Sequence, residues 1–148
     1  MTYKKLTREF ILKTVKNGEQ PAIKIRQSKD AADYARAFYG DDIEIYESVF
    51  IILLNRANNT IGWAKIGQGG VAGCSVDRKI VCKYAIDSLA SGVILVHNHP
   101  SGNLLPSTQD TVLARALKSA LGTLDINFLD SIIITSDGYR SMFDESDY

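Results

Sequence analysis

The chain has 148 residues, of which 45% are hydrophobic and 23% charged, and 17 Lys and Arg balance 17 Asp and Glu to a formal net charge of zero. This length and composition are typical of one soluble globular domain that can bury a core without disulfides. A zero net charge argues against a broad cationic surface for nucleic acid, although it leaves room for a local basic patch.

No segment reads as a secretion signal or as a membrane span. The N-terminal stretch MTYKKLTREF lacks the apolar core of a signal peptide, and apolar runs such as VFIILL are too short to cross a bilayer. Cys74 and Cys82 lack the C-x-x-C spacing and are expected to be free thiols in a reducing compartment. The sequence therefore predicts a cytoplasmic protein with no membrane partner.

Residues 1–46 are predicted to form an N-terminal extension that carries a hairpin and a helix. Residues 8–16 fit either a helix or a strand. The Asn17-Gly18 turn signal that follows favours a hairpin, in which 22–26 is the second strand.

A helix and two strands are predicted next. The helix covers 28–40, with Ser28 as its N-cap and Gly40 just past its end. The run SVFIILLN at 48–55 is apolar between its ends, which is typical of a strand buried on both faces. The residues RANN then turn the chain back into a second strand over 60–66.

The middle of the chain predicts a loop, a helix and a short strand. The residues GQGGVAGCS at 67–75 are a glycine-rich loop, without the spacing or the Lys-Ser/Thr pair of a P-loop. A helix over about 77–90 follows, capped at Asp77 and ended near Gly92. The run VILV at 93–96 predicts a buried strand.

The C-terminal part predicts one helix and two strands. The helix covers 107–122 and ends at Gly122. Its apolar stripe consists of Val112, Leu113, Ala116, Leu117, Ala120 and Leu121. Strands at 131–135 and 139–143 flank an Asp-Gly turn. Buried strands with intervening helices indicate an α/β fold, in which helices lie on the faces of a sheet.

Both histidines of the chain lie one residue apart in VHNHPSGNLLPSTQD, residues 96–110. Because alternate side chains of an extended backbone share a face, His97 and His99 point the same way. They lie at the carboxyl end of a strand, which is where α/β folds commonly bind their ligands. Asp110 lies in the first turn of the next helix. Two imidazoles and one carboxylate, with water in the fourth position, form a common catalytic zinc set. The spacing therefore predicts a metal site.

The Ser107-x-x-Asp110 pair also has a purely structural interpretation. It resembles a capping box, in which the hydroxyl accepts an N–H of the first turn and the carboxylate lies at the positive end of the helix dipole. From the spacing alone, capping and metal binding both stay open for this pair.

The full set of residues resembles a known family. The pattern His97-x-His99, seven residues, Ser107, two residues, Asp110 is similar to the JAMM motif of JAB/MPN metalloproteases. The string HNHPSGNLLPSTQD resembles the RadC branch of that family more closely. The blocks ESVFIILLNRANNTIG, GGVAGCSVDRKI and FLDSIIITSDGYRS extend the resemblance over 47–148, in the order expected of RadC-like proteins. The N-terminal extension lies outside it.

The resemblance implies a single RadC-like JAB/MPN domain over 1–148, a mixed sheet flanked by helices and similar to cytidine-deaminase-like α/β sandwiches. Full-length RadC-like proteins usually carry an N-terminal helix-hairpin-helix region as well, for which 148 residues leave no room, and this weakens an inherited role in DNA binding. They often have Asp-His where this chain has Asp130-Ser131. We expect this change to alter a contact near the site or at the surface and to leave the metal ligands intact.

The resemblance also implies a role for each site residue. His97, His99 and Asp110 would bind one Zn²⁺ per chain. Glu47 would act as general base and acid on the zinc-bound water, and Ser107 would donate a hydrogen bond to that water or to the developing oxyanion. On the residues alone Glu47 is weakly specified, because other carboxylates lie close by. These are Asp41, Asp42 and Glu44.

Three functions are compatible with the sequence. The first is hydrolysis of peptide or isopeptide bonds in a protein substrate by a zinc-activated water. The second is a nucleic-acid-linked accessory role in DNA repair or with mobile elements, and the third is a non-catalytic scaffold, against which the intact ligand set counts. The consecutive letters HNH do not form the ββα unit of HNH nucleases. The His-x-Glu and Pro-Cys-x-x-Cys of zinc deaminases are absent from the sequence.

Loops 67–75 and 100–106 are expected to border the substrate cleft, because loops at the carboxyl ends of strands commonly shape such sites. Cys74 is expected either near this rim or, as the more usual alternative, as a buried thiol. Exposed strand edges at both ends of the chain are compatible with an oligomer.

Overall fold

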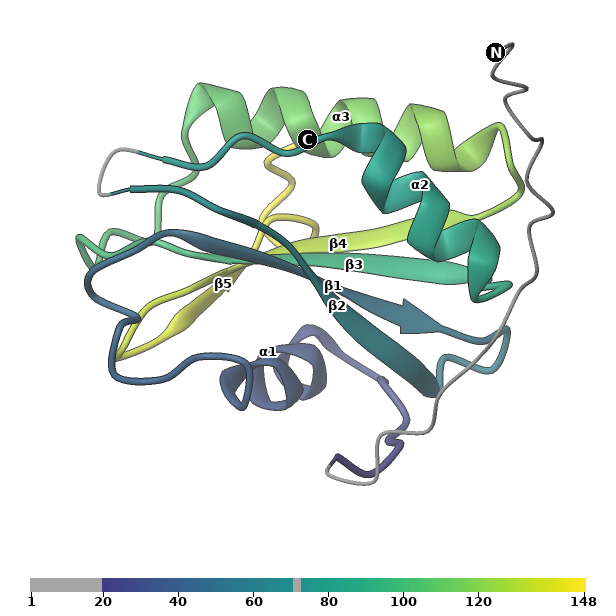
Figure 1. The fold of residues 1–148 in the computed structure, drawn as a ribbon, viewed down its shortest axis with the longest axis horizontal. Coiled ribbons are helices and arrows are strands. Elements are labelled where there is room, and N and C mark those ends of the chain that lie inside the picture. The colour runs from purple at the N-terminus through teal and green to yellow at the C-terminus, as the bar shows by residue number, and fades with distance from the viewer. Residues whose placement is uncertain (1–19, 71–72) are drawn as a thin grey trace, which may run out of the picture.

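The computed structural model describes residues 20–70 and 73–148 and arranges them as a sheet between helices (Figure 1). The elements are α1 (Ser28–Arg36), β1 (Ser48–Leu54), β2 (Thr60–Gln68), α2 (Arg78–Asp87), β3 (Gly92–Asn98), α3 (Thr108–Gly122), β4 (Asn127–Ile134) and β5 (Tyr139–Ser141). The strand order is β2-β1-β3-β4-β5, with β3 and β4 parallel and the other neighbours antiparallel. Helix α1 covers one face, and α2 and α3 cover the other (Figure 1). The predicted α/β class, a mixed sheet flanked by helices, is confirmed.

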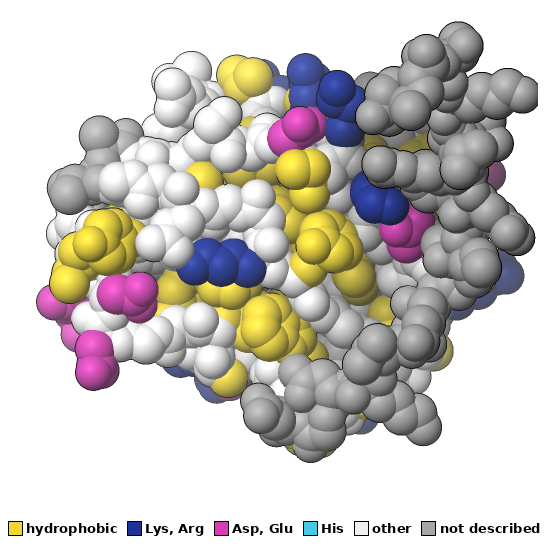
Figure 2. Space-filling view, in the orientation of Figure 1, with side chains coloured by type: hydrophobic (Ala, Val, Ile, Leu, Met, Phe, Trp, Pro, Cys, Tyr) yellow, Lys and Arg dark blue, Asp and Glu magenta, His cyan; other side chains and the backbone are white. Residues whose placement is uncertain are grey.

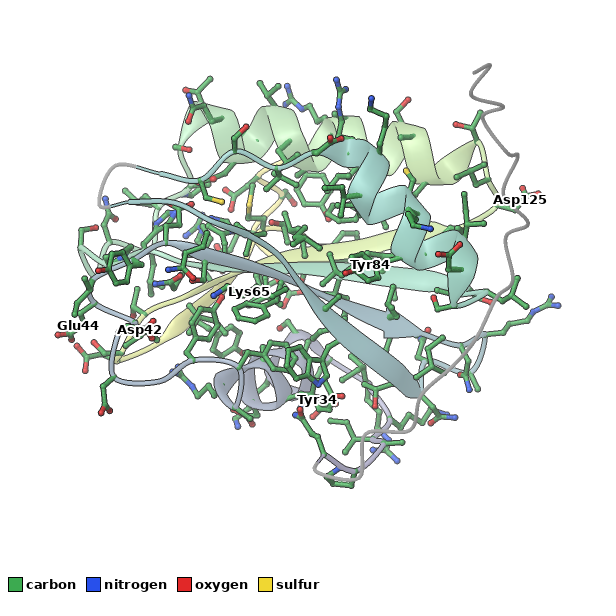
Figure 3. The ribbon with its side chains drawn as sticks, viewed as in Figure 1. Tyr34, Asp42, Glu44, Lys65, Tyr84 and Asp125 are labelled. Atoms are coloured by element: carbon green, nitrogen blue, oxygen red, sulfur yellow. The ribbon has the colours of Figure 1, made fainter. Side chains whose placement is uncertain are left out.

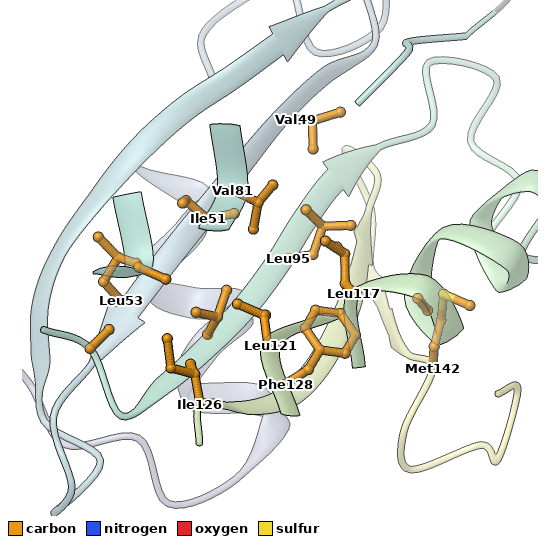
Figure 4. Packing of buried hydrophobic residues seen from close by; sticks show 14 of the residues in the cluster. Val49, Ile51, Leu53, Val81, Leu95, Leu117, Leu121, Ile126, Phe128 and Met142 are labelled. Atoms are coloured by element: carbon orange, nitrogen blue, oxygen red, sulfur yellow. The ribbon is translucent and has the colours of Figure 1, made fainter. Parts of the chain in front are cut away.

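Strands β1 and β3 form the centre of the sheet, and every residue in both is buried. Ile51 and Leu95 pack with Leu117 of α3 in one cluster. Ile52 and Ile94 pack in a second cluster that includes residues of α1. Figure 4 shows the first cluster, in which side chains of the sheet meet those of α2 and α3. Burial on both faces explains why these strands read as continuous apolar runs.

This two-sided burial decides which face each residue at the end of β3 occupies. Side chains alternate along a strand. Leu95 belongs to the cluster on the α3 face, and Val96 belongs to the cluster on the α1 face. His97 therefore continues the row on the α3 face, and Asn98 continues the row on the α1 face.

Helix α1 begins and ends differently from the prediction. Its N-cap is Gln27 and not Ser28, because the Asp30 carboxylate accepts hydrogen bonds from the backbone N–H groups of Arg26 and Gln27, at 2.8 and 3.2 Å. This carboxylate fixes the chain one residue before the predicted start. The helix ends at Arg36 and is shorter than predicted.

The predicted second strand of the N-terminal hairpin, 22–26, is wrong. The segment makes one isolated bridge, between Lys24 and Asn59. The N–H of Ile25 also donates to the carbonyl oxygen of Asn58, so the segment lies along the turn between β1 and β2. The predicted first strand, 8–16, lies outside the described residues.

The boundaries of β2 and α2 also differ from the prediction. Strand β2 continues to Gln68, which was assigned to the glycine-rich loop, and α2 ends at Asp87, well before Gly92. The predicted cap of α2 is confirmed, because the Asp77 carboxylate accepts the N–H of Lys79 at 2.9 Å.

Helix α3 buries a stripe slightly different from the predicted one. Leu117 and Leu121 are buried as expected, and Ala114 joins them. Val112, assigned to the stripe, is 60% exposed. At 3.6 residues per turn, Val112 lies about 200° around the helix from Ala114 and therefore faces away from the sheet. None of the described helices is long and apolar enough to cross a membrane.

Exposed apolar side chains gather on the outer face formed by β2 and α2. Figure 2 shows hydrophobic groups across the middle of this face, interrupted by Lys and Arg. Ile61 and Trp63 of β2 and Ile80 and Tyr84 of α2 are each at least 37% exposed. None of these four side chains lines the cleft described below.

Asp130 of β4 is a buried carboxylate that ties the C-terminal segment to the sheet. It accepts hydrogen bonds from the Ser141 hydroxyl at 2.6 Å and from the backbone N–H of Phe143 at 3.0 Å. Burial raises the pKa of Asp130 to about 6, and the hydrogen bonds oppose this rise only in part. The adjacent Ser131 is fully buried, so the departure from the Asp-His pair of RadC-like proteins lies in the interior and not at the surface.

We expect Asp130→Asn to remove a pH dependence of stability. Folding raises the pKa of Asp130 from 3.8 to about 6, so the folded state holds this proton more tightly than the unfolded chain does. The resulting stabilisation is fully present below about pH 4 and is lost as the pH rises through about 6, by about 2–3 kcal/mol. Urea denaturation in EDTA should show the free energy of unfolding of the wild type falling by that amount relative to the variant. A constant difference across this range would contradict the raised pKa.

Candidate metal centre

The end of β3 and the first turn of α3 bring three potential metal ligands together. The Nε2 atoms of His97 and His99 are 3.1 Å apart. Nε2 of His97 lies 3.3 Å from Oδ1 of Asp110, and Nε2 of His99 lies 3.3 Å from Oδ2 of Asp110. Among the described residues, this is the only group of three or more His, Cys, Asp or Glu whose ligand atoms all lie within 4.8 Å of one another. The structure thus brings together the three side chains that the sequence singled out as ligands.

The separations within this group fit a tetrahedral metal ion. Ligand atoms about 2.0–2.1 Å from such an ion lie about 3.3–3.4 Å from one another. The two Nε2 atoms are 3.1 Å apart, and each lies 3.3 Å from a different oxygen of Asp110, His97 from Oδ1 and His99 from Oδ2. Two imidazoles and a carboxylate are donor types that zinc accepts, and three protein ligands leave a fourth position for water. The donor set therefore fits a divalent ion with one open position.

A backbone carbonyl orients the imidazole of His99. Its Nδ1 lies 2.6 Å from the carbonyl oxygen of Asn103. This contact assigns the proton to Nδ1 and leaves the lone pair on Nε2, which faces His97 and Asp110. The hydrogen bond with Asp110 raises the pKa of His99, so protons and a metal ion would compete for its Nε2.

Ser107 and Asp110 form the predicted capping box. The Ser107 hydroxyl accepts the N–H of Asp110 at 3.1 Å, and Oδ2 of Asp110 accepts the N–H of Ser107 at 2.7 Å. Capping does not compete with metal binding, because Oδ1 of the same carboxylate faces His97. Burial raises the pKa of Asp110, but the hydrogen bonds with His97 and His99 outweigh burial and hold it well below its usual range.

Glu47 precedes β1 and lines the same cleft as His99 and Asp110. The N–H of Gly69 donates to its carbonyl oxygen at 2.8 Å. Only glycine fits at Gly69, because a Cβ there would lie 1.8 Å from the carbonyl oxygen of Gly73. Burial raises the pKa of the Glu47 carboxyl. The acidic neighbours Asp42 and Glu44 are exposed and project outward at the edge of the molecule (Figure 3). Glu47 is therefore the carboxylate of this turn that reaches the cleft.

The cleft has a volume of about 730 Å³ and is bordered by both predicted loops. Gly73–Ser75 of the glycine-rich loop line it, as do several residues of 100–106. Cys74 is half-buried: it lines the cleft, which confirms its predicted place near the rim, and it also packs against the core cluster. The described lining residues include the carboxylates of Glu47 and Asp110 and no Lys or Arg.

Comparison with known proteins decides the family. The family model described as a RadC-like JAB domain matches residues 25–147. The chain belongs to the RadC-like JAB family. The match begins before α1, so the family includes residues 25–46 of the extension that the sequence blocks left out.

Curated relatives of this RadC-like JAB domain are UPF0758 proteins. That of Flavobacterium johnsoniae is 39% identical over 122 residues, which cover 82% of this chain and 52% of the relative. A Neisseria meningitidis relative is 34% identical over 122 residues, 82% of this chain and 53% of the relative. A third, from Porphyromonas gingivalis, is 38% identical over 100 residues, 67% of this chain and 44% of the relative. The chain spans about half the length of the curated relatives it matches.

Two contacts near the site of this RadC-like JAB domain leave no signal in the sequence. One is the carbonyl of Asn103 behind His99, and the other is the buried side-chain amide of Asn98. Both contacts involve backbone atoms, which are the same in every residue type. Neither spacing nor periodicity therefore signals them.

We expect the cap of α3 to be measurable separately from any metal. Ser107→Ala should lower the free energy of unfolding by about 1 kcal/mol in EDTA, because an N–H of the first turn loses its acceptor. Ser107→Gly, the matched control, should cost only a few tenths of a kcal/mol, since glycine is tolerated at N-caps. Equal losses in the two variants by urea denaturation would show that Ser107 stabilises the fold in some other way.

Proposed function

We propose that this RadC-like JAB domain is a zinc-dependent hydrolase of peptide or isopeptide bonds. The observation that carries the proposal is the convergence of His97, His99 and Asp110, with separations of 3.1–3.3 Å, at a cleft that also holds Glu47. The complete donor set, oriented by a capping box and by a backbone carbonyl, favours a metal enzyme over a non-catalytic scaffold.

One Zn²⁺ per chain would be held by Nε2 of His97, Nε2 of His99 and a carboxylate oxygen of Asp110. Bound zinc lowers the pKa of its water from 15.7 toward ~7 and so supplies a nucleophile at neutral pH. The protein's own part is to direct both imidazoles at one point. The Asn103 carbonyl does this for His99 by holding a proton on Nδ1, which leaves Nε2 for the metal.

Glu47 is the proposed proton carrier. It lines the cleft but is not a member of the ligand group, so its carboxylate is free to take a proton from the attacking water. The same group would return that proton to the leaving amine. Ser107 is the proposed hydrogen-bond donor to the oxyanion. Its oxygen accepts the cap bond, which leaves the hydroxyl proton available.

The charge of the cleft supports an amide substrate over a phosphodiester. Its described lining has two carboxylates and no Lys or Arg. Phosphate groups are usually held by Arg, Lys or additional metal ions, because the ester carries a negative charge. A peptide or isopeptide bond is neutral and needs no such partner. The nucleic-acid-linked alternative therefore has no supporting feature in this cleft.

Protein purified without added metal should contain about one Zn²⁺ per chain by elemental analysis. The double variant His97→Ala/His99→Ala should lose most of it, because a single carboxylate remains. Cys74→Ser/Cys82→Ser is the matched control and should keep it, since neither thiol belongs to the ligand group. Stoichiometric zinc in the histidine variant, or zinc lost in the cysteine variant, would place the metal elsewhere.

Glu47→Gln should separate catalysis from metal binding. The change keeps size and polarity but removes the basic carboxylate, so zinc content and the free energy of unfolding should stay near those of the wild type. Turnover of a peptide or isopeptide-linked substrate found by library screening should fall by roughly 10²–10⁴-fold. Glu44→Gln, the same substitution at an exposed position, should change neither. Zinc lost from Glu47→Gln would make Glu47 a ligand, and undiminished turnover would assign the proton transfer to another group.

A further inference from the structure

Asn98 lies between the two histidines in sequence but on the opposite face of β3. Its side chain is fully buried. Oδ1 accepts the backbone N–H of Ser48 at 2.7 Å, and Nδ2 donates to the carbonyl oxygens of Ile43 and Tyr46, at 2.6 and 2.8 Å. Both N–H donors and the oxygen of the side-chain amide thus form hydrogen bonds with one short segment of backbone, residues 43–48. That segment is the turn that leads through Glu47 into β1.

These bonds form where the ladder between β1 and β3 stops. Its last antiparallel pair is Val49 with His97. If this register is continued by one residue, Ser48 lies opposite Asn98. There the N–H of Ser48 donates to Oδ1 of Asn98 and not to a backbone carbonyl of β3. Continued by one more residue, the register brings Glu47 level with the second histidine. Because side chains alternate, Glu47 shares the face of Val49 and His97.

We propose that Asn98 is the positioning residue that fixes Glu47 against the histidine pair. The inference rests on the function proposed above, since Glu47 is a proton carrier only there. Proton transfer needs donor and acceptor within about 2.6–3.2 Å, and a displacement of about 1 Å can cost on the order of 10²-fold in rate. Without the amide, Glu47 and Ser48 keep contacts with the end of β2 and with Tyr39, but none with β3. Glu47 exchanges backbone hydrogen bonds with Gly69 and Gly70, at 2.8 and 3.5 Å. Ser48 pairs with Gln68, and its carbonyl accepts the Tyr39 hydroxyl.

Each member of the ligand group has contacts that do not involve the Asn98 side chain. Asp110 is fixed by the capping box with Ser107, and His99 by the carbonyl of Asn103. His97 is paired within the sheet with Val49 and Ile133. A loss of the Asn98 amide should therefore release the turn and leave metal binding intact. This separation makes the positioning role distinguishable from a general role in stability.

Amide hydrogen exchange of the full chain tests the contact first in the wild type. The N–H of Ser48 has a side-chain acceptor instead of a partner in the β1–β3 ladder. It should nevertheless exchange slowly, with protection comparable to that of ladder amides in β1. Exchange of Ser48 at the rate of an unstructured amide would overturn the proposal before any substitution is made.

Asn98→Ala and the smaller perturbation Asn98→Ser then test the consequence. Protection of Ser48 should fall on the order of tenfold, the effect of losing one hydrogen bond. Zinc content and the protection of Ile51 to Leu53 should stay at wild-type values. Unchanged protection of Ser48, or zinc lost together with it, would overturn the proposal.

Asn55→Ala is the matched control at the other end of β1. Oδ1 of Asn55 accepts the N–H groups of Ala57 and Asn59, each at 3.0 Å. This variant should lose protection at those two amides and keep it at Ser48. Loss at Ser48 here as well would make the effect a general loosening of β1 and would overturn the specific role of Asn98.

Turnover adds a readout that a purely structural role would not produce. If Asn98 acts through Glu47, Asn98→Ala should lower the turnover of the wild type but cause no further fall in the Glu47→Gln background. Equal falls in both backgrounds would show that Asn98 acts on something else. If the wild type cleaves no peptide or isopeptide substrate, the proposed hydrolase fails, while the exchange of Ser48 still decides whether Asn98 holds the turn.

Discussion

The antiparallel pairing of β1 with β3 is the interaction on which the candidate site depends. Burial of both strands on both faces supplies the stabilisation, and the register of the pair supplies the geometry. With Val49 beside His97, the turn before β1 meets the end of β3, across a sequence separation of 50 residues between Ser48 and Asn98. A slip of β3 by one residue would move His97 from the α3 face to the α1 face and separate it from Asp110.

The carboxylate of Asp110 serves the helix and the site together. One oxygen closes the capping box at the start of α3, and the other faces His97. The cap bonds involve no metal, so this group is oriented before a metal arrives. The position at the helix N-terminus also favours the anionic form that a metal ligand needs. The structural and functional interpretations of the Ser-x-x-Asp pair are therefore both compatible with the same geometry.

The sequence predicted those parts of the fold that depend on local pattern. The central strands can be recognised in the sequence as apolar runs, because each is covered on both faces. The capping box and the histidine spacing are also local, so the convergence of His97, His99 and Asp110 could be predicted. The start of α1 could not be, because the Asp30 side chain bonds to backbone upstream of the predicted cap. Val112 fits a helical stripe by spacing but faces solvent, since packing against the sheet sets the phase of α3. The role of Asn98 depends on backbone partners whose proximity only the folded sheet creates.

The proposed zinc site has two imidazoles at the end of β3 and one carboxylate in the first turn of α3. X-ray absorption at the zinc K-edge of protein purified without added metal tests this site most directly, because it reports which atoms surround the metal. We expect a shell of nitrogen and oxygen atoms at about 2.0–2.1 Å, with the outer scattering of two imidazoles. A sulfur shell at about 2.3 Å would contradict it, because that distance identifies a cysteine thiolate and so a site built from Cys74 or Cys82.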